Sequence, residues 1–537
     1  LSRIYRAAKA YNYLTMMGGV VISSGPDLAR IAMVDGMERA MRQAYLPLIR
    51  GLKGLKLNKK EAMIAGGALE NELATMSRHM ADTGDVFGKK TAFEEFLVQS
   101  NGPFSVVNLF NAWNSTMKGM AASVTGARII EDALALRVSR LRSSSSTIVD
   151  VPGLVSQRDG RKLGAAYNRK SNTVKINPEE VDQGWKDRAW ENPKMEGVDA
   201  LPPDFIRTKA EWRQFVVNHE LAHADYPILK DAKGNVIEEA AEYENRMNRV
   251  AASRIWLRRN SIKGGDKFSV EKLARGGINE ELADRIGAQW EQYGQIDTQA
   301  ARFKNNSSAT TDDGGMMVFN AGNWKDAHAA NRFRETVAAE IDRTIVTPGA
   351  GDVPLWMSTE LGSVIGQFKT FGMASMGRVV IPALQQADSE IMMGLMYMTA
   401  LGMIVHKLKA GLGGYDNQLE NDSVADWLGN GLDRSGALAY FSDVNRVVET
   451  MSGGQLGFGA TGQPASLKQG AGVLGGPTGG QIANIGNILG DVVSGSADRY
   501  TVSAARRLAV GQNIFYLDPL FDGIQSFGNS PTTDLGE

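Results

Sequence analysis

The chain reads Val-Val-Asn-His-Glu-Leu-Ala-His-Ala-Asp-Tyr at residues 216–226, a stretch that contains the pattern H-E-x-x-H. Residues four apart lie on one face of a helix, so His219 and His223 point the same way and can reach one Zn²⁺. Glu220 would lie beside the open metal position, where a carboxylate can deprotonate a bound water. The apolar residues that precede this stretch are spaced as in a buried helix.

Two histidines and a water leave a tetrahedral zinc ion one protein ligand short. A second helix, rich in acids, is predicted after the turn at residues 230–235. Its Glu238 and Glu242 resemble the glutamate helix of gluzincin metallopeptidases. That resemblance implies Glu238 as the third ligand and Glu242 as the acid that orients a ligand histidine. The family usually has Asp at the later position, and Glu239 takes the place of Glu238 if the helix phase differs.

Composition limits the classes of function. The 537 residues include 59 basic and 60 acidic side chains, a balance that does not indicate general nucleic-acid binding. Cysteine is absent, which excludes disulfides and thiolate metal sites, so any metal must use histidine and carboxylate ligands. The length predicts several domains. Because the chain begins with Leu1, we expect it to be a piece of a longer polypeptide.

Helical periodicity over most of the chain predicts a mainly α fold, an extended helical scaffold with an inserted small α+β zincin-like domain and a Gly-rich C-terminal region. We expect a break between helices at residues 101–103, and we expect residues 451–480 to be extended or ordered only by a partner. The predicted divisions are a helical region at 1–142, the zincin-like domain at 147–260, a helical region with an apolar hairpin at 269–450, and a Gly-rich tail with short helices at 451–537.

A small sheet is predicted before the H-E-x-x-H helix. Residues 147–151 read as a strand, and residues 165–168 and 173–177 read as a hairpin. An edge strand in this position can hold an extended peptide by strand addition. Tyr167 and Tyr243 are candidates for stabilising an oxyanion, and the sequence does not choose between them.

Residues 391–405 form the most membrane-like stretch of the chain. A spanning helix needs about 20 apolar residues, and charged residues close this stretch on both sides. We therefore expect a buried helix hairpin, with insertion into a membrane after assembly as the alternative.

Outside the zincin-like region, further segments resemble the C-terminal region of large internal virion proteins of short-tailed phages. These segments are Trp-Met-Ser-Thr-Glu at 356–360, Ile-Gly-Gln-Phe-Lys at 365–369, Leu-Asp-Arg-Ser-Gly at 432–436, Gln-Asn-Ile-Phe-Tyr at 512–516, and residues 18–27. The resemblance covers about 1–142 and 270–525. It implies a DNA-ejection protein that is packaged in the capsid, released through the portal and tail, and then helps to form a conduit across the host envelope.

The same resemblance implies the partners: other copies of the chain, other ejection proteins, portal or tail proteins, phage DNA in transit, and the host membrane after ejection. Our main hypothesis is therefore an internal virion protein that carries a zinc-metallopeptidase-like domain. The alternative is an active virion-borne zinc endopeptidase that cleaves a virion or host-envelope protein. A third hypothesis is a structural or pore protein without metal, in which the acidic helix is solvated and the two histidines are incidental. Zinc content separates the last two.

Overall fold

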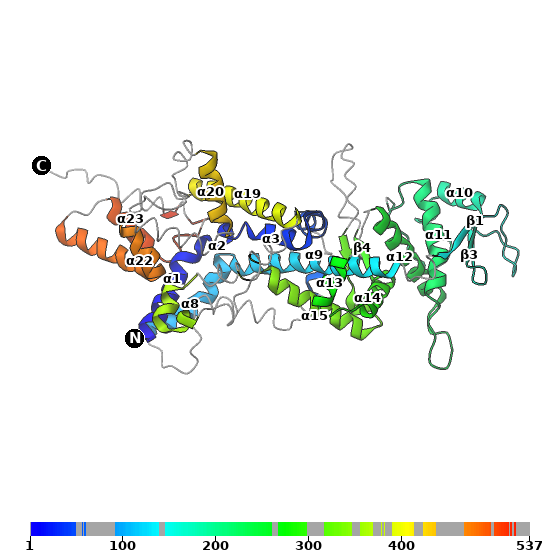
Figure 1. Cartoon of the computed structure of the whole chain (residues 1–537), viewed down its shortest axis with the longest axis horizontal. Helices are drawn as coiled ribbons and strands as arrows, with labels where there is room; N and C mark the ends of the chain where they lie inside the picture. The colour runs from blue at the N-terminus through cyan, green and yellow to red at the C-terminus, as the bar shows by residue number, and fades with distance from the viewer. Residues whose placement is uncertain are drawn as a thin grey trace. The chain divides into compact units, whose positions relative to one another are not determined.

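The chain is described by a computed structural model that is mainly helical, as the sequence predicts (Figure 1). Helices account for 70% of the described residues, and the strands are few and short. The described residues are 2–49, 56, 58–60, 92–138, 145–203, 205–259, 267–297, 316–345, 355–368, 377, 381, 389–412, 423–436, 467–495, 499–514, 516–517 and 520–521.

The chain packs into two compact units, each built from segments that are separate in the sequence. Unit 1 consists of Leu1–Met37, Gly67–Lys118 and Asp342–Glu537, and unit 2 consists of Glu38–Gly66 and Gly119–Ile341. The predicted zincin-like range 147–260 lies wholly within unit 2. Its independence as a domain stays a prediction.

Unit 2 contains the predicted three-stranded sheet. Its order is β1 (Thr147–Asp150), β3 (Thr173–Ile176), β2 (Ala165–Asn168), with β1 parallel and β2 antiparallel to β3. The hairpin prediction is therefore confirmed. Val174 and Ile176 are fully buried while Lys175 between them is exposed, as the two-residue period of a strand requires. The buried side belongs to the core that includes Phe215 of α11 (Lys209–Asp225).

Local signals in the sequence fix where the helices next to this sheet begin. Asn177 caps α10 (Pro178–Lys186) by accepting the Glu179 N–H, and Thr208 caps α11 by accepting the Glu211 N–H. The other elements of unit 2 are α4 (Met37–Ala40), η2 (Met41–Tyr45), α5 (Leu46–Ile49), most of α9 (Phe110–Val138), α12 (Ala240–Arg259), α13 (Lys267–Arg275), α14 (Glu280–Tyr293), β4 (Gln295–Asp297), β5 (Met316–Val318), η5 (Ala321–Asn323) and α15 (Ala327–Thr344).

The regular elements in the described part of unit 1 are all helices. Its elements are α1 (Ser2–Met16), η1 (Met17–Gly19), α2 (Val20–Ser23), α3 (Asp27–Asp35), α8 (Ala92–Val107), the first turns of α9, η7 (Leu355–Ser358), α16 (Glu360–Ile365), α19 (Ser389–Leu412), α20 (Val424–Ser435), α22 (Leu467–Ser494) and α23 (Arg499–Leu508). A core around Tyr13, Leu14 and Phe104 joins α1 to α8.

The helix break predicted at residues 101–103 is wrong. Helix α8 continues through Pro103, and the chain breaks at Asn108 and Leu109 instead. Asn108 stabilises this break because its side-chain oxygen accepts the Phe110 N–H at 3.0 Å and its amide nitrogen donates to the Met17 carbonyl at 3.0 Å. Leu109 adopts a positive φ of 61°. Packing to α1 and η1 therefore outweighs the preference of proline for a helix start.

The expectation that residues up to 480 lack regular structure is wrong for 467–480, which belong to the long helix α22; residues 451–466 lie outside the described residues. Two polar side chains of α1 bond to this helix. Asn12 donates to the Thr478 hydroxyl at 2.8 Å, and Thr15 accepts the Gln481 amide at 3.0 Å. These tertiary contacts supply what the glycine-rich sequence lacks in helix propensity.

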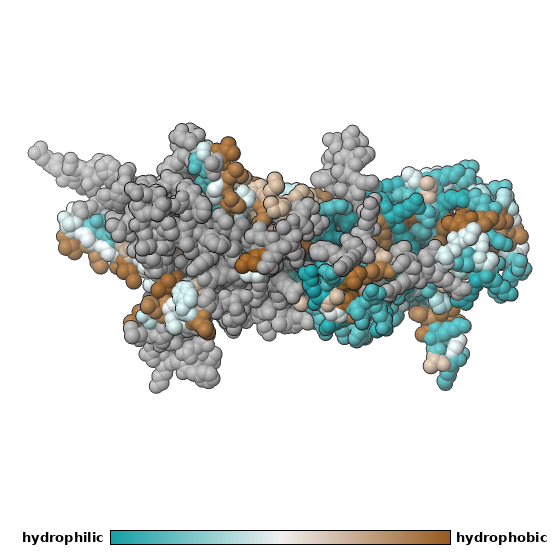
Figure 2. All heavy atoms as spheres, viewed as in Figure 1, coloured by the Kyte–Doolittle hydropathy of each residue, from teal (hydrophilic) through white to brown (hydrophobic). Residues whose placement is uncertain are grey.

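The apolar stretch 391–405 lies in α19, which packs on α20 as the predicted hairpin. Glycines allow the close approach, because a Cβ at Gly402 would lie 2.0 Å from the Gly431 carbonyl oxygen. The helix is not fully buried, since Met396 and Ile404 are exposed. Figure 2 shows hydrophobic surface along α20, the visible part of α19, and α22. No helix among the described residues has the length and apolarity needed to cross a bilayer.

Candidate metal centre

Helix α11 carries the H-E-x-x-H pattern on the surface that faces α12. Trp212 and Phe215 are buried in the core shared with the sheet, and this anchors the first half of the helix. One turn later His219 and His223 project together, with their Nε2 atoms 3.1 Å apart. The prediction that both histidines share one face is confirmed.

Helix α12 places a carboxylate beside the two histidines. Its buried positions Met247, Val250 and Ala251 pack toward α11, and Glu244 lies on the same face because it precedes Met247 by about one turn. A Glu244 carboxylate oxygen lies 3.1 Å from His219 Nε2, and the other lies 4.0 Å from His223 Nε2. Among the described residues, these three form the one group of histidines and acids placed closely enough to hold a metal ion.

The spacing of the three side chains can be compared with what zinc requires. With metal–ligand bonds of about 2.1 Å, tetrahedral geometry places ligand atoms about 3.4 Å apart. The observed distances run from 3.1 to 4.0 Å, close to that value. The side chains of His219, His223 and Glu244 are 19%, 24% and 32% exposed, so water has access to them. Two imidazoles and one carboxylate also match the ligand sets of catalytic zinc sites.

The sequence predicts Glu238 as the third ligand, but the structure places its carboxylate elsewhere. Glu238 precedes α12 and forms an ion pair with Arg246, in which Nε and Nη2 donate at 2.8 and 2.6 Å. The Leu229 N–H also donates to it at 3.1 Å. Both paired side chains are 2% exposed. Burial raises the pKa of Glu238, but the hydrogen bonds from Arg246 and Leu229 outweigh it and leave the pKa below the usual value.

The structure does not bring the other two predicted acids to the cluster either. Glu239 and Glu242 are both exposed. Glu242 is two residues from Glu244, about 200° around the helix, so it points away from α11. The role predicted for Glu242, holding a ligand histidine, is filled by Tyr243 in the structure. The sequence did contain one indication of Glu244. It is spaced three and seven residues before Met247 and Ala251, which places all three on one face of a helix.

Tyr243 holds His223 in place. The Tyr243 hydroxyl donates to the Tyr226 carbonyl at 3.2 Å, so its oxygen accepts the proton on His223 Nδ1 at 2.9 Å. We infer that His223 is protonated on Nδ1 and presents the Nε2 lone pair to the cluster. Burial lowers the pKa of His223 to about 4, and the neighbouring His219 adds to this effect. His223 is therefore in the neutral form that binds metal at pH 7.

The two tyrosines proposed for oxyanion stabilisation both bond to protein groups. Tyr243 bonds as described, and the Tyr167 hydroxyl donates to the Asn172 side-chain oxygen at 2.7 Å. His219 is held less firmly than His223, because its Nδ1 is buried and has no hydrogen-bond partner among the described residues. Its hydrogen bond with Glu244 is the first cause of a lowered pKa at that carboxyl group.

Glu220 directs its carboxylate toward the sheet. Its Oε2 accepts the backbone N–H of Tyr167 on β2 at 3.1 Å, whereas Oε1 accepts no hydrogen bond from the described residues. Burial raises the pKa of Glu220, and the neighbouring His219 and the Tyr167 N–H offset this only in part. A carboxylate with a raised pKa takes a proton from water more readily, as a general base must.

A buried ionic network fixes the C-terminal end of α11. Arg254 bonds to Asp225 at 2.8 Å and to Glu291 at 3.2 Å, and the Tyr226 hydroxyl also donates to Glu291. Arg137 donates to the Tyr226 oxygen at 3.0 Å. Burial and the charge of Glu291 raise the pKa of Tyr226 well above its usual value. The network ties α11 to α9, α12 and α14, which limits the movement of His223 about one turn earlier and of His219 about two turns earlier.

A scan against protein-family models found no match, and searches of curated proteins and of solved structures found none either.

Proposed function

We propose that His219, His223 and Glu244 bind one zinc ion and that Glu220 is the general base for hydrolysis of a peptide bond at this site. The observation that carries the proposal is the meeting of three zinc-type donor atoms from α11 and α12, all within 4.8 Å of one another. When bound, zinc would lower the pKa of a coordinated water and polarise a substrate carbonyl.

The chain's own residues divide the remaining work. Glu220 Oε1 is available to take a proton from water and to return it to the leaving amine, while Oε2 is held by Tyr167. Tyr243 keeps the Nε2 lone pair of His223 directed at the cluster. The buried network around Tyr226 holds the helix in place.

The edge of the sheet favours a peptide as the substrate. Strand β2 is an edge strand that lies against α11. The Asn177 N–H bonds to the Gly164 carbonyl, so the alternate residues Ala165 and Tyr167 direct their backbone groups away from β3. An extended peptide that paired along this edge would pass beside Glu220, which already meets the Tyr167 N–H.

Metal analysis of the purified chain is the first test. We expect about one zinc per chain, as for a mononuclear site, and its loss in His219→Ala and in His223→Ala. His328→Ala is the matched control, because His328 is exposed and lies outside the cluster. A folded wild-type chain that binds no zinc even when zinc is supplied would refute the proposal.

Activity is tested separately from binding. Glu220→Gln should keep the zinc and lose cleavage of an unstructured protein substrate, since the amide cannot take a proton. Glu239→Gln, an exposed neighbour of the second helix, should retain cleavage. Cleavage by Glu220→Gln at the wild-type rate would exclude Glu220 as the base.

We also propose, from the resemblance to phage internal virion proteins, that the chain is ejected with the genome and helps to form the conduit across the host envelope. The exposed methionines 392, 393 and 396 on α19 support a role that includes partner binding, because methionine-rich surfaces repack against different partners. Mass spectrometry of purified virions should detect the chain, and its absence from them would contradict this second proposal.

A further inference from the structure

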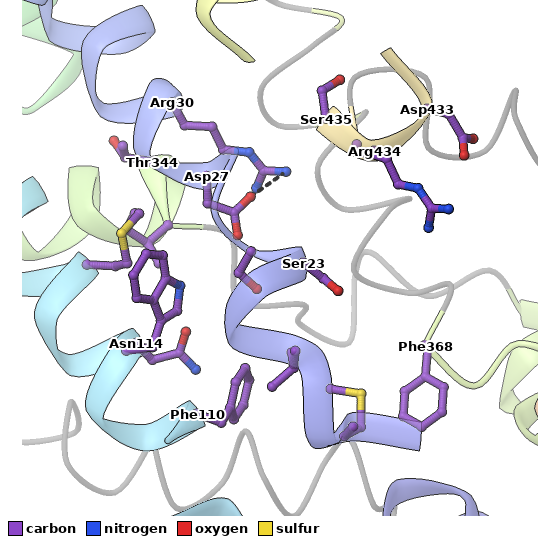
Figure 3. A pocket seen from close by; sticks show the side chains of 17 residues that line it. Ser23, Asp27, Arg30, Phe110, Asn114, Thr344, Phe368, Asp433, Arg434 and Ser435 are labelled. Atoms are coloured by element: carbon purple, nitrogen blue, oxygen red, sulfur yellow. Dashed lines mark ion pairs between the residues drawn. The ribbon is translucent and has the colours of Figure 1, made fainter. Parts of the chain in front are cut away.

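Unit 1 contains a cavity of about 270 Å³ that no part of the proposed metal chemistry uses. Figure 3 shows residues of α2, α3, the start of α9 and the end of α20 that line it. Its volume equals that of about nine water molecules in the liquid, at about 30 Å³ each. A small organic molecule of similar volume can therefore be accommodated.

One part of the lining is apolar. Side chains from η1, α2, α9 and the end of the 355–368 segment provide it, namely Met17, Val20, Phe110, Trp113, Met117 and Phe368. Met17, Phe110 and Met117 are buried within the fold, so this wall is part of the packed core of unit 1. Apolar walls with few polar groups are typical of small-molecule sites.

The opposite part carries charged groups from two helices. Arg30 of α3 is 2% exposed and pairs with Asp27 at 3.2 Å. Arg434 of α20 extends into the space that the helices enclose (Figure 3). Among the described residues, the buried Nε of Arg434 has no hydrogen-bond partner and the side chain forms no ion pair. A buried guanidinium nitrogen without an acceptor is costly, and a bound anion would satisfy it.

A third cation lies near Arg434. Lys409 of α19 donates to the hydroxyl of Ser23, a lining residue, at 2.6 Å. Burial lowers the pKa of Lys409 to about 8, and the charge of Arg434 lowers it further than Asp433 raises it. Burial also raises the pKa of Asp27, which weakens the negative charge on the same side. Asp433 is the other acid of the lining, and Arg30, Arg434 and the adjacent Lys409 outnumber Asp27 and Asp433. The polar end of the cavity is therefore suited to an anion.

We propose that this cavity binds an amphiphilic carboxylate, with its apolar body against Phe110, Met117 and Phe368 and its carboxylate at Arg434. A planar guanidinium can donate two parallel hydrogen bonds to a carboxylate. Small hydrated anions are not the preferred ligands, because they would make no contact with the apolar side chains of the wall. An uncharged amphiphile such as an alcohol can accept only a single, weaker hydrogen bond from Arg434.

Isothermal titration of the full chain with octanoate tests the proposal. Octanol, which has the tail without the charge, and acetate, which has the charge without the tail, serve as comparison ligands. We expect octanoate to bind at least about tenfold more tightly than either, since a hydrogen bond to a charged group contributes that much affinity. Octanol binding as tightly as octanoate, or no octanoate binding to the folded chain, would overturn the proposal.

Two substitutions with opposite expected signs locate the site. Arg434→Gln should weaken octanoate binding at least about tenfold, whereas Asp27→Asn should strengthen it, because it releases Arg30 from its carboxylate partner. Arg161→Gln is the matched control, since Arg161 is 83% exposed and pairs with Asp159 in unit 2. Thermal melting of each variant verifies that it folds. Unchanged affinity in folded Arg434→Gln, or weaker binding in folded Asp27→Asn, would place the ligand elsewhere.

Discussion

Two glutamates, Glu238 just before α12 and Glu244 in its second turn, lie in opposite surroundings. The Glu238 carboxylate is 2% exposed, and it accepts hydrogen bonds from the Arg246 guanidinium and from the Leu229 N–H. Glu244 is 32% exposed, and its carboxylate faces His219 and His223. Spacing along a sequence therefore cannot assign a metal ligand by itself. A carboxylate that an arginine neutralises is a structural group, whereas one that faces two imidazoles is available to a cation.

The largest expected effect separates the two glutamates by stability. Glu238→Ala leaves the Arg246 guanidinium buried without its carboxylate, which should lower the free energy of unfolding by about 3–5 kcal/mol. Denaturant unfolding measures this, with the exposed Glu239→Ala as control, expected to change by less than about 0.5 kcal/mol. The folded fraction of Glu238→Ala should still bind zinc. Lost zinc with unchanged stability would instead make Glu238 a ligand.

The second effect concerns metal affinity. Glu244→Gln replaces a charged ligand with a neutral amide, and we expect zinc affinity to fall by at least about a hundredfold, beyond the typical loss for groups that only orient a ligand. Competition with a chromogenic chelator measures the affinity. Glu242→Gln, two residues away and exposed, should bind zinc as the wild type does. If the two variants bind zinc equally well, the cluster is not the metal site.

A smaller effect is expected at the residue that holds His223. Tyr243→Phe keeps the ring over Arg246, 5.2 Å from the guanidinium, and removes only the hydroxyl that accepts the Nδ1 proton. Zinc affinity should fall about tenfold, the lower end of the range for such partners. Tyr167→Phe, whose hydroxyl bonds to Asn172, is the matched variant and should not change it. Equal zinc affinity in the two variants would mean that the Tyr243 hydroxyl is not needed to fix the tautomer of His223.

The smallest effect is a pH dependence of the metal-free chain. Folding lowers the pKa of His223 from 6.5 to about 4, so protons bind the unfolded chain first as the pH falls. The stabilisation present above pH 6.5 should therefore be lost progressively down to about pH 4. We expect a loss of about 1 kcal/mol, reduced by solvent screening of the partly exposed ring.

Urea unfolding in the presence of a chelator measures this slope. His223→Gln should flatten it, and His328→Gln, at an exposed histidine, should leave it unchanged. A chain whose stability rises between pH 6.5 and pH 4 would contradict the burial of a neutral His223.

The sequence by itself determined the features that depend on neighbours along the chain. The four-residue spacing of His219 and His223 fixes their common face because helix geometry is local. The hairpin of residues 165–168 and 173–176 follows from strand periodicity and a turn between the strands, and the register confirms it. The mainly α character follows in the same way from the period of apolar residues.

Only the tertiary structure decided which acid meets the histidines. It depends on which face of α12 packs against α11, and on the ion pair that Arg246 forms with Glu238. The long helix α22 likewise depends on Asn12 and Thr15 of α1, more than four hundred residues earlier in the chain. The cavity in unit 1 combines Arg30 with Arg434 for the same reason. Such contacts leave no periodic pattern in the sequence, because side chains distant in sequence meet only after the helices have packed.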